Sequence, residues 1–379
     1  MNDLFTFRPD PVARRLRLIQ EARQMLAWAE DGRRHQPVYD SVDGMLGKLY
    51  LCVTFACPLR CDFCQADGGV RQSKELSPDR LLEITREAVF AGFREIVVTG
   101  GEPLVYSGMD TLMRAWRIMD KGQTKFVLRT SFGFPVPEER IRLITQAFDE
   151  ITVSIDGDEQ RHDSIRGKGV YRLAVANIRA CLQEGSAAVN LSSVMEKEEF
   201  AGGPGQAVGH LRDELGIEKW VVRSPMPLGR GDCEKNRNRP RFEWRTSDDR
   251  LPARLEPRFS CGFGQNVYME PDGTCYPCYV WCRQEDRLGD LSKDGLSDML
   301  AGKKLLACLN CGVDTNRKCR ECRVRYLCGG ECKLYYKDKD DPDCGEFDCS
   351  EWKNSLLEKI SRLDEMERRL TEKREEQRS

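Results

Sequence analysis

Three cysteines on one short loop constrain this chain more than any other feature. They lie in the run VTFACPLRCDFC as Cys57-x3-Cys61-x2-Cys64, directly after an apolar segment (residues 49–55) that predicts a buried strand. A [4Fe–4S] cluster normally takes four cysteine ligands, so three leave one iron open to a small molecule. Zinc is the alternative, although structural zinc sites close four protein ligands and this loop would need a fourth from elsewhere.

Strand-like and helix-like segments alternate from residue 49 to residue 223, which indicates right-handed βαβ units and a parallel sheet. Six strands are too few for a closed eight-stranded barrel, whereas an open partial barrel and a doubly wound sheet both fit. An amphipathic helix is expected over residues 9–30. The expected strands are 50–54, 95–99, 125–129, 150–155, 189–194 and 220–223, and the expected helices are 78–91, 109–120, 137–147, 171–184 and 205–214.

Composition narrows the class of protein further. The net charge of −2 gives no argument for nucleic-acid or membrane binding, and no apolar run approaches the ~18 residues of a membrane span. The first residues lack the apolar stretch of a signal peptide, so a cytoplasmic location is expected. Because the cytosol is reducing, metal ligation explains the 18 cysteines better than disulfides do.

The cysteine loop, with Phe63 just before its third cysteine, resembles that of radical S-adenosylmethionine (SAM) enzymes. Gly100-Gly101-Glu102-Pro103, at the end of the second expected strand, is similar to the segment that holds the SAM amine in that family. The run from Ser154 to Arg166 resembles one whose serine contacts the SAM ribose and whose arginine pairs with the SAM carboxylate. The resemblance thus implies cofactor-binding roles for Phe63, Gly100, Gly101, Glu102, Ser154 and Arg166, and it favours the partial barrel.

A second group of cysteines resembles the SPASM extension of this family, which holds two auxiliary [4Fe–4S] clusters. The family pattern implies an outer and an inner cluster. The outer one would be held by Cys319, Cys322, Cys328 and Cys349 (with Cys344 competing for the last place), and the inner one by Cys261, Cys278 and Cys332, with Cys275 or Cys282 as a fourth ligand. Cys308 and Cys311 lie outside this pattern and have no assigned role.

The expected fold is therefore α/β: a partial (β/α)6 parallel barrel followed by a cysteine-rich iron–sulfur (SPASM) domain. The expected parts are an N-terminal helical extension (1–47), the radical SAM barrel (48–228), a polar linker (229–258), the SPASM domain with two auxiliary clusters (259–350) and a charged C-terminal helix (351–379).

The resemblance implies an enzyme that cleaves SAM to a 5′-deoxyadenosyl radical and oxidatively modifies a ribosomally made peptide, by a thioether or carbon–carbon crosslink or by desaturation. Three [4Fe–4S] clusters and SAM would be its cofactors. Two auxiliary clusters favour net oxidation, because they accept the electron left on the substrate. The alternatives are a small-molecule dehydrogenase and a formylglycine-type sulfatase maturase. Tyr279 and Asp156 are the only candidates for a catalytic side chain.

The expected partners follow from the same reading. They are a peptide or protein substrate, a flavodoxin- or ferredoxin-type reductant and a separate protein that binds a leader peptide. Only about 47 residues precede the first expected strand, too few for the winged-helix leader-binding domain of many peptide maturases.

Overall fold

The computed structural model divides the chain into two compact units. One contains residues 40–249 and 264–308, and the other contains residues 1–39, 250–263 and 309–379. The structure describes residues 11–233, 236, 243–246, 256–330, 332, 349–350, 353–354, 357, 365, 367–369 and 371–372. The expected C-terminal helix (351–379) lies largely outside these ranges, and Cys344 lies wholly outside them.

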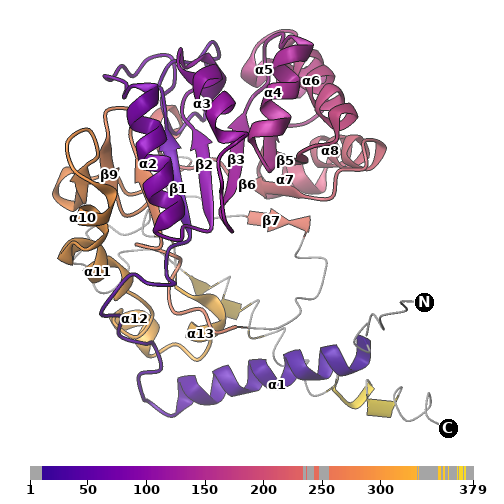
Figure 1. Ribbon diagram of the computed structural model, residues 1–379. Coiled ribbons are helices and arrows are strands. Elements are labelled where there is room, and N and C mark those ends of the chain that lie inside the picture. Colours follow the sequence, from indigo (N-terminus) through magenta and orange to yellow (C-terminus); the bar gives the residue numbers. More distant parts are fainter. Residues whose placement is uncertain are drawn as a thin grey trace, which may run out of the picture. The chain divides into compact units, whose positions relative to one another are not determined.

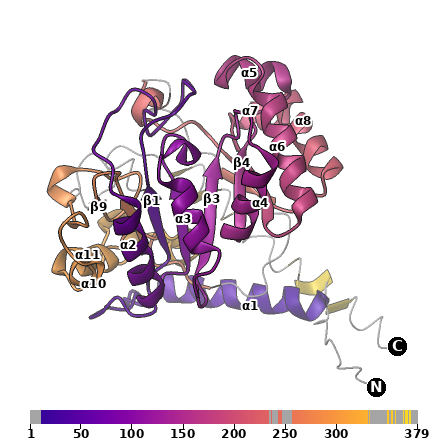
Figure 2. The ribbon, with the colours of Figure 1, turned by 45° about the horizontal axis from the view of Figure 1, so that its top comes forward.

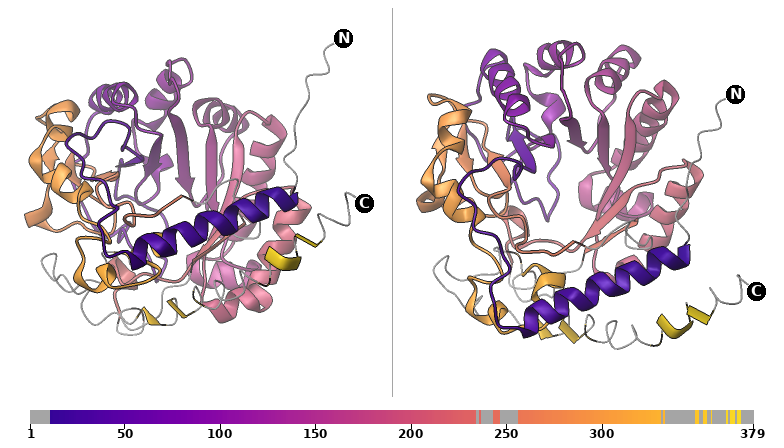
Figure 3. Two further views of the ribbon diagram at one scale, coloured as in Figure 1. Left: turned by 90° about the horizontal axis from the view of Figure 1, so that it is seen from below. Right: turned by 60° about the horizontal axis from the view of Figure 1, so that its bottom comes forward.

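The larger unit is built on one sheet with the strand order β10-β9-β8-β1-β2-β3-β4-β5-β6-β7. Strands β1 to β6 are parallel and adjacent in chain order, which confirms the expected parallel α/β architecture. The strands follow an arc with helices along its outer side (Figures 1 and 3). Their bounds are β1 Lys48–Cys52, β2 Glu95–Thr99, β3 Lys125–Thr130, β4 Glu150–Ser154, β5 Ala188–Val194, β6 Trp220–Arg223, β7 Glu243–Arg245, β8 Asn266–Met269, β9 Thr274–Tyr276 and β10 Gly289–Asp290.

Helices connect these strands close to where the sequence predicts them. Ser77 caps the first, its hydroxyl accepting a hydrogen bond from the Arg80 amide, and Gly185 ends another in the left-handed conformation (φ 69°). Figure 2 shows several of them on one side of the sheet. The bounds are α2 Pro78–Phe90, α3 Met109–Trp116, α4 Glu138–Ala147, α5 Glu159–Arg166, α6 Val170–Glu184, α7 Lys197–Ala201, α8 Gly203–Glu214, α10 Leu296–Leu300 and α11 Lys303–Leu309, with short 3₁₀ turns η1 Pro103–Val105, η2 Gly229–Gly231 and η4 Gln284–Asp286.

Segments beyond the six expected strands extend the sheet at both edges. The segment expected to be a polar linker contributes β7, which pairs antiparallel with β6. At the other edge β8 pairs parallel with β1, with Tyr268 opposite Tyr50, and a hairpin leads on to β9. These pairings could not be predicted because β7 and β9 are three residues long and carry no clear alternation. Residues 264–308 of the expected SPASM segment therefore belong to the barrel unit.

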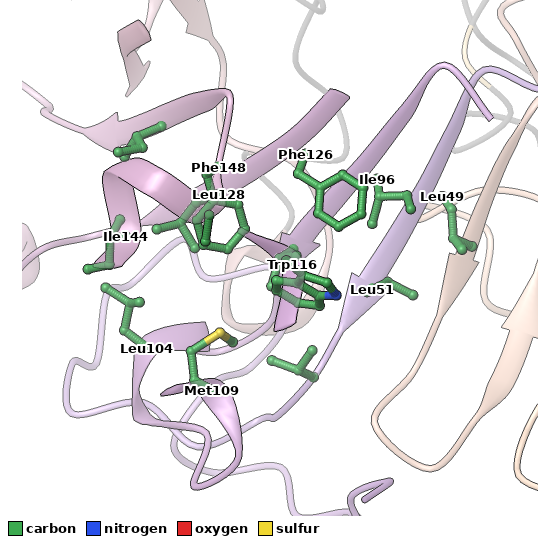
Figure 4. Close-up of a cluster of buried hydrophobic side chains, with 14 of the residues drawn as sticks. Leu49, Leu51, Ile96, Leu104, Met109, Trp116, Phe126, Leu128, Ile144 and Phe148 are labelled. Atoms are coloured by element: carbon green, nitrogen blue, oxygen red, sulfur yellow. The ribbon is translucent and has the colours of Figure 1, made fainter. Parts of the chain in front are cut away.

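The main hydrophobic core fills the space between the sheet and the outer helices. Side chains from alternate strand positions, such as Leu49 and Phe126, meet Trp116 of α3 there (Figure 4). Trp116 packs edge-on against Phe126 and Phe148, with ring centroids 5.5 and 5.7 Å apart. Because all three rings are essentially inaccessible to water, this cluster fixes α3 and α4 against the strands.

The smaller unit contains α1 (Pro11–Glu30), α12 (Arg317–Arg320) and α13 (Arg325–Cys328). At its centre the buried carboxylate of Asp314 accepts hydrogen bonds from the Tyr326 hydroxyl (2.8 Å), the Arg325 guanidinium (3.1 Å) and the Gln36 amide (2.8 Å). Both partners of the Arg325–Asp314 ion pair are 2% exposed, so this network holds α13 to the segment after α1. No described helix of the chain is long and apolar enough to cross a membrane.

The core makes a first prediction. Phe126→Ala should lower the free energy of unfolding by about 3–5 kcal/mol, because it removes a buried ring and leaves a cavity beside Trp116. Phe90→Ala is the control, since that ring is 92% exposed. Denaturant unfolding followed by circular dichroism measures both, and similar midpoints for the two variants would contradict the packing described.

Candidate active site

The three cysteines of the first motif come together where β1 ends. Cys57, Cys61 and Cys64 share one hydrophobic cluster with Phe63 and Ile165. An N–H group lies within hydrogen-bonding distance of each sulfur: the Leu59 and Gly68 amides are 3.4 Å from Cys57 Sγ and Cys64 Sγ, and the Arg166 guanidinium is 3.9 Å from Cys61 Sγ. Donors of this kind stabilise metal-bound thiolates, so the donor set fits an iron–sulfur cluster.

Burial sets the electrostatics of the cysteine loop. Desolvation raises the pKa of Cys57 to about 11 and also raises the pKa of Cys61, although Arg166 opposes the shift at Cys61. Across the described residues, no group of three or more Cys, His, Asp or Glu side chains is arranged around a single metal ion.

Backbone contacts fasten this loop to the end of β2. The Gly101 amide donates to the Thr54 carbonyl and the Glu102 amide to the Ala56 carbonyl, both at 2.8 Å. A Cβ at Gly101 would lie 2.4 Å from the Ala56 oxygen, so only glycine allows this approach. The predicted Gly100–Glu102 segment thus lies directly against the cysteine loop.

The side chain of Glu102 is committed to the end of β3. Its carboxylate is 1% exposed and accepts hydrogen bonds from the Ser131 amide (2.8 Å), the Ser131 hydroxyl (2.6 Å) and the Thr130 hydroxyl (2.8 Å). Burial raises the pKa of Glu102, and these hydrogen bonds oppose the rise. With its carboxylate engaged in this way, the segment presents backbone carbonyls rather than a free acid.

Asp156 connects the ends of β4 and β5 to Arg166. One carboxylate oxygen accepts from the Val194 amide (2.8 Å), and the other accepts from Arg166 Nε (2.5 Å). Asp156 is wholly buried and the Arg166 side chain is 10% exposed. Because both oxygens are used, Asp156 is placed to position Arg166, which in turn faces Cys61 and lies over the Phe63 ring at 5.7 Å. Ser154 lies nearby as the last residue of β4, opposite Ser192 of β5.

Arg230 was not predicted from the sequence, and it stabilises the cysteine loop. Its amide donates to the Cys64 carbonyl and its Nε to the Cys61 carbonyl, both at 2.9 Å, and its Nη1 reaches Asp67 at 2.7 Å. The preceding Gly229 has φ 54°, and a Cβ there would lie 2.4 Å from the Cys64 oxygen. No motif marks this position, because the contact joins residues more than 160 positions apart.

The cysteines of the second group divide between the two units. Cys275, Cys278 and Cys282 belong to the larger unit, where Cys275 is fully buried in the hydrophobic core beside the helices. Tyr279 packs on Tyr50 of β1, with ring centroids 5.1 Å apart, and burial raises its pKa to about 12 against the opposing effect of Arg223. Cys261, Cys319, Cys322, Cys328, Cys332 and Cys349 belong to the smaller unit.

The sequence of this chain is similar to a known protein family and to several characterised proteins. Residues 51–199 match the model of the radical SAM superfamily. The chain is similar to the mycofactocin maturase MftC of Mycolicibacterium smegmatis (25% identity over 276 residues, 64% of this chain and 67% of that protein). It is also similar to the GTP 3′,8-cyclase of Petrotoga mobilis (26% identity, 39% of this chain), of whose length the match spans 47%.

A solved structure agrees in fold. The structure of Streptococcus suis SuiB bound to precursor peptide SuiA superposes with a TM-score of 0.61 at 15% identity, covering 86% of this chain and 78% of that one. Residues 51–199 of this chain therefore form a radical SAM domain. The relatives of the chain include a peptide maturase, and its cysteine-rich C-terminal part is consistent with the SPASM subgroup.

The brace formed by Arg230 makes a second prediction. Arg230→Ala should lower the iron bound after anaerobic reconstitution, because it removes the hydrogen bonds to the Cys61 carbonyl and to Asp67. Iron per chain and absorbance near the iron–sulfur band measure the effect. Arg86→Ala, on the exposed face of α2, is the matched control. Equal iron content in the two variants would show that the loop holds its shape without Arg230.

His162 makes a third prediction, on pH. Its ring is fully buried, and its Nδ1 accepts a hydrogen bond from the Asp156 amide (3.2 Å), whereas its Nε2 has no hydrogen-bond partner among the described residues. Burial lowers the pKa of His162 to about 4. In the unfolded chain His162 takes up a proton near pH 6.5, whereas the buried ring stays neutral until about pH 4. The contribution of His162 to the free energy of unfolding is therefore retained above pH 6.5 and lost below it. About 2 kcal/mol should disappear between pH 6.5 and 5.

Thermal unfolding from pH 7.5 to 5 tests this dependence. His162→Gln should show a shallower fall in melting temperature with acid than the wild type, whatever its stability at neutral pH. Parallel curves for the two proteins would mean that another group carries the acid sensitivity.

Proposed function

We propose that this enzyme oxidatively modifies a ribosomally made peptide, using SAM bound at a [4Fe–4S] cluster held by Cys57, Cys61 and Cys64. The observation that carries the proposal is the arrangement of these three sulfurs, each beside an N–H group, next to the end of β2. The cluster and SAM together would supply a hydrogen-abstracting 5′-deoxyadenosyl radical. The similarity to MftC and to the fold of SuiB, which was solved with its precursor peptide, supports a peptide substrate.

The chain's own residues would bind and orient SAM. Backbone carbonyls of the Gly100–Glu102 segment are suited to the SAM ammonium group, since they lie beside the cysteine loop at a strand end. Arg166 uses Nε for Asp156 and Nη1 for the Cys61 sulfur, so its Nη2 would reach the SAM carboxylate while the buried Asp156 holds the guanidinium in place. Ser154 would contact the ribose, and Phe63 would lie along the cluster beneath Arg166.

Two auxiliary clusters would accept the electron that oxidation leaves on the substrate. Cys319, Cys322, Cys328 and Cys349 would hold the outer one, and all four lie in the smaller unit. Cys278 would ligate the inner one, together with Cys261 and Cys332. Of the two candidates for its fourth ligand, Cys282 is exposed and Cys275 lies in the apolar core, so Cys282 is preferred. A ferredoxin- or flavodoxin-type protein would supply the first electron.

A small-molecule substrate is the second candidate. It is favoured by the similarity to a GTP 3′,8-cyclase, although that match covers only 39% of this chain and 47% of that protein. Tyr279, where a sulfatase-type maturase of this family carries an aspartate, argues against formylglycine formation.

The fourth prediction tests the proposal at its first step. The reduced, reconstituted enzyme should produce 5′-deoxyadenosine from SAM, and replacement of Cys57, Cys61 and Cys64 together by Ala should abolish it while leaving most of the remaining iron bound. Cys233→Ala, which changes an exposed cysteine outside the motif, should behave as wild type. SAM cleavage by the triple variant would refute the assignment.

Substrate oxidation is then read from mass. Anaerobic co-expression with small peptides encoded beside the gene should yield a product lighter by two hydrogens per event, and fragmentation should locate the loss. If SAM is cleaved but every such peptide keeps its mass, oxidative peptide modification is the wrong reaction, and small-molecule substrates become the leading candidates.

A further inference from the structure

The face of the sheet turned away from the helices differs in chemistry from the face that carries the core. Strand residues alternate between the two faces. The helix-facing positions of β3 and β4 are buried and mainly apolar, as at Leu128 and Val153, whereas Arg129, Thr152 and Ser154 on the other face are partly exposed. Arg129 of β3 pairs in register with Thr152 of β4, and Ser154 pairs with Ser192 of β5. We call this polar side the inner face.

In the ranges that the structure describes, the charged side chains on the inner face are paired, with one exception. Near the start of the strands, Lys48 pairs with Glu95 (2.5 Å), and Lys125 and Lys219 both pair with Glu150 (3.1 Å). At the far end Arg223 pairs with Glu243 (3.1 Å).

Arg129 is the exception. Among the residues that the structure describes, its guanidinium has no hydrogen-bond or ion-pair partner. It makes a cation–π contact with the ring of Tyr50, at 5.1 Å from the ring centroid. A partly buried guanidinium with five unsatisfied donors favours an anionic ligand.

Two tyrosines lie beside this arginine. Tyr50 of β1 carries Arg129 over its ring and contacts the ring of Tyr279. Neither hydroxyl has a hydrogen-bond partner within the described part of the chain, so both can donate to a ligand. Arg129 and Tyr279 thus supply a cationic and a neutral hydrogen-bond donor, and both side chains contact the ring of Tyr50.

The position of this pair relates it to the chemistry. The cysteine loop follows the carboxyl end of β1, and Cys278 follows β9, which pairs with β8 beside β1. Tyr50 is the central residue of β1, and Tyr279 directly follows Cys278. The Arg129–Tyr279 pair therefore lies on the inner face at the middle of β1, next to Cys278 and one strand's half-length from the cysteine loop.

We propose that Arg129 and Tyr279 bind a carboxylate of the substrate, anchoring the residue next to the carbon that reacts. This inference rests on the proposed function. It names the substrate class as a peptide with an acidic side chain or a free C-terminal carboxylate near the reacting position. Arg129 would take the two carboxylate oxygens through its planar fork, and the Tyr279 hydroxyl would donate a third hydrogen bond. The SAM carboxylate is not a competitor, because Arg166 at the strand ends is assigned to it.

Protection of Arg129 from phenylglyoxal tests the proposal without any turnover. The cluster-loaded, SAM-bound enzyme is labelled anaerobically without reductant, and the rate at Arg129 is read by peptide mass spectrometry. Three capped tripeptides serve as probes: N-acetyl-Gly-Glu-Gly-amide, N-acetyl-Gly-Gln-Gly-amide and N-acetyl-Gly-Gln-Gly with a free carboxyl group. One or both carboxylate-bearing probes should slow labelling about fivefold or more, and the neutral probe should not. Which of the two protects identifies the side-chain or the C-terminal carboxylate as the ligand.

Variants separate specific binding from general shielding. Tyr279→Phe should reduce the protection, because it removes one donor and keeps the ring on Tyr50. Arg86→Gln on the outer face of α2 should leave the labelling of Arg129 and its protection unchanged. Equal slowing by all three probes, slowing by none, or no reaction at Arg129 in the free enzyme would overturn the proposal.

These outcomes are independent of SAM cleavage, because no reductant is present. An enzyme that fails to make 5′-deoxyadenosine but still shows selective protection would refute the proposed function and leave the carboxylate site standing.

Discussion

The buried carboxylate of Glu102 is the contact on which the site depends. It belongs to the segment after β2, its amide donates to the loop after β1, and its side chain gathers the Thr130 and Ser131 donors at the end of β3. A carboxylate 1% exposed is stable only while these donors satisfy it. The ends of three strands are therefore held in one geometry, and the cysteine loop takes its shape from that geometry.

The buried carboxylate of Asp156 links the ends of later strands, as that of Glu102 links the ends of the first three. Its two oxygens tie the end of β5 to the last residue of α5, and through Arg166 they reach the sulfur of Cys61. The loop is also braced from the opposite side by Arg230. The described side chains Glu102, Asp156, Arg166 and Arg230 are thus held in place, which under the proposed function would suit an enzyme that must keep a radical away from its own chain.

Much of the fold was predictable from sequence, and the reasons differ between parts of the chain. The β2 and β6 bounds were correct because continuous apolar runs lie between clear turn signals, whereas the predicted helix over 109–120 ends at Trp116, four residues early. The parallel order of β1 to β6 followed from the alternation of elements. Helix α5 was missed because its eight residues include only one apolar side chain, Ile165. Within the site, the residues of the motifs were identifiable from sequence. Arg129 and Arg230 were not, because their roles depend on contacts with residues far away in the chain.

The pairing of β8 with β1 has a consequence for the flow of charge. Both strands belong to one hydrogen-bonded sheet, and five residues of β1 span about 17 Å from end to end. A group held by the first cysteine loop would lie at the carboxyl end of this strand, and a group held at Cys278 would lie next to Tyr279, whose ring packs on the central residue of the strand. Under the proposed function, the separation between the site of hydrogen removal and Cys278 would be set by a hydrogen-bonded sheet rather than by a hinge or a linker. The distance that the electron has to travel from the substrate would then be a property of the sheet itself.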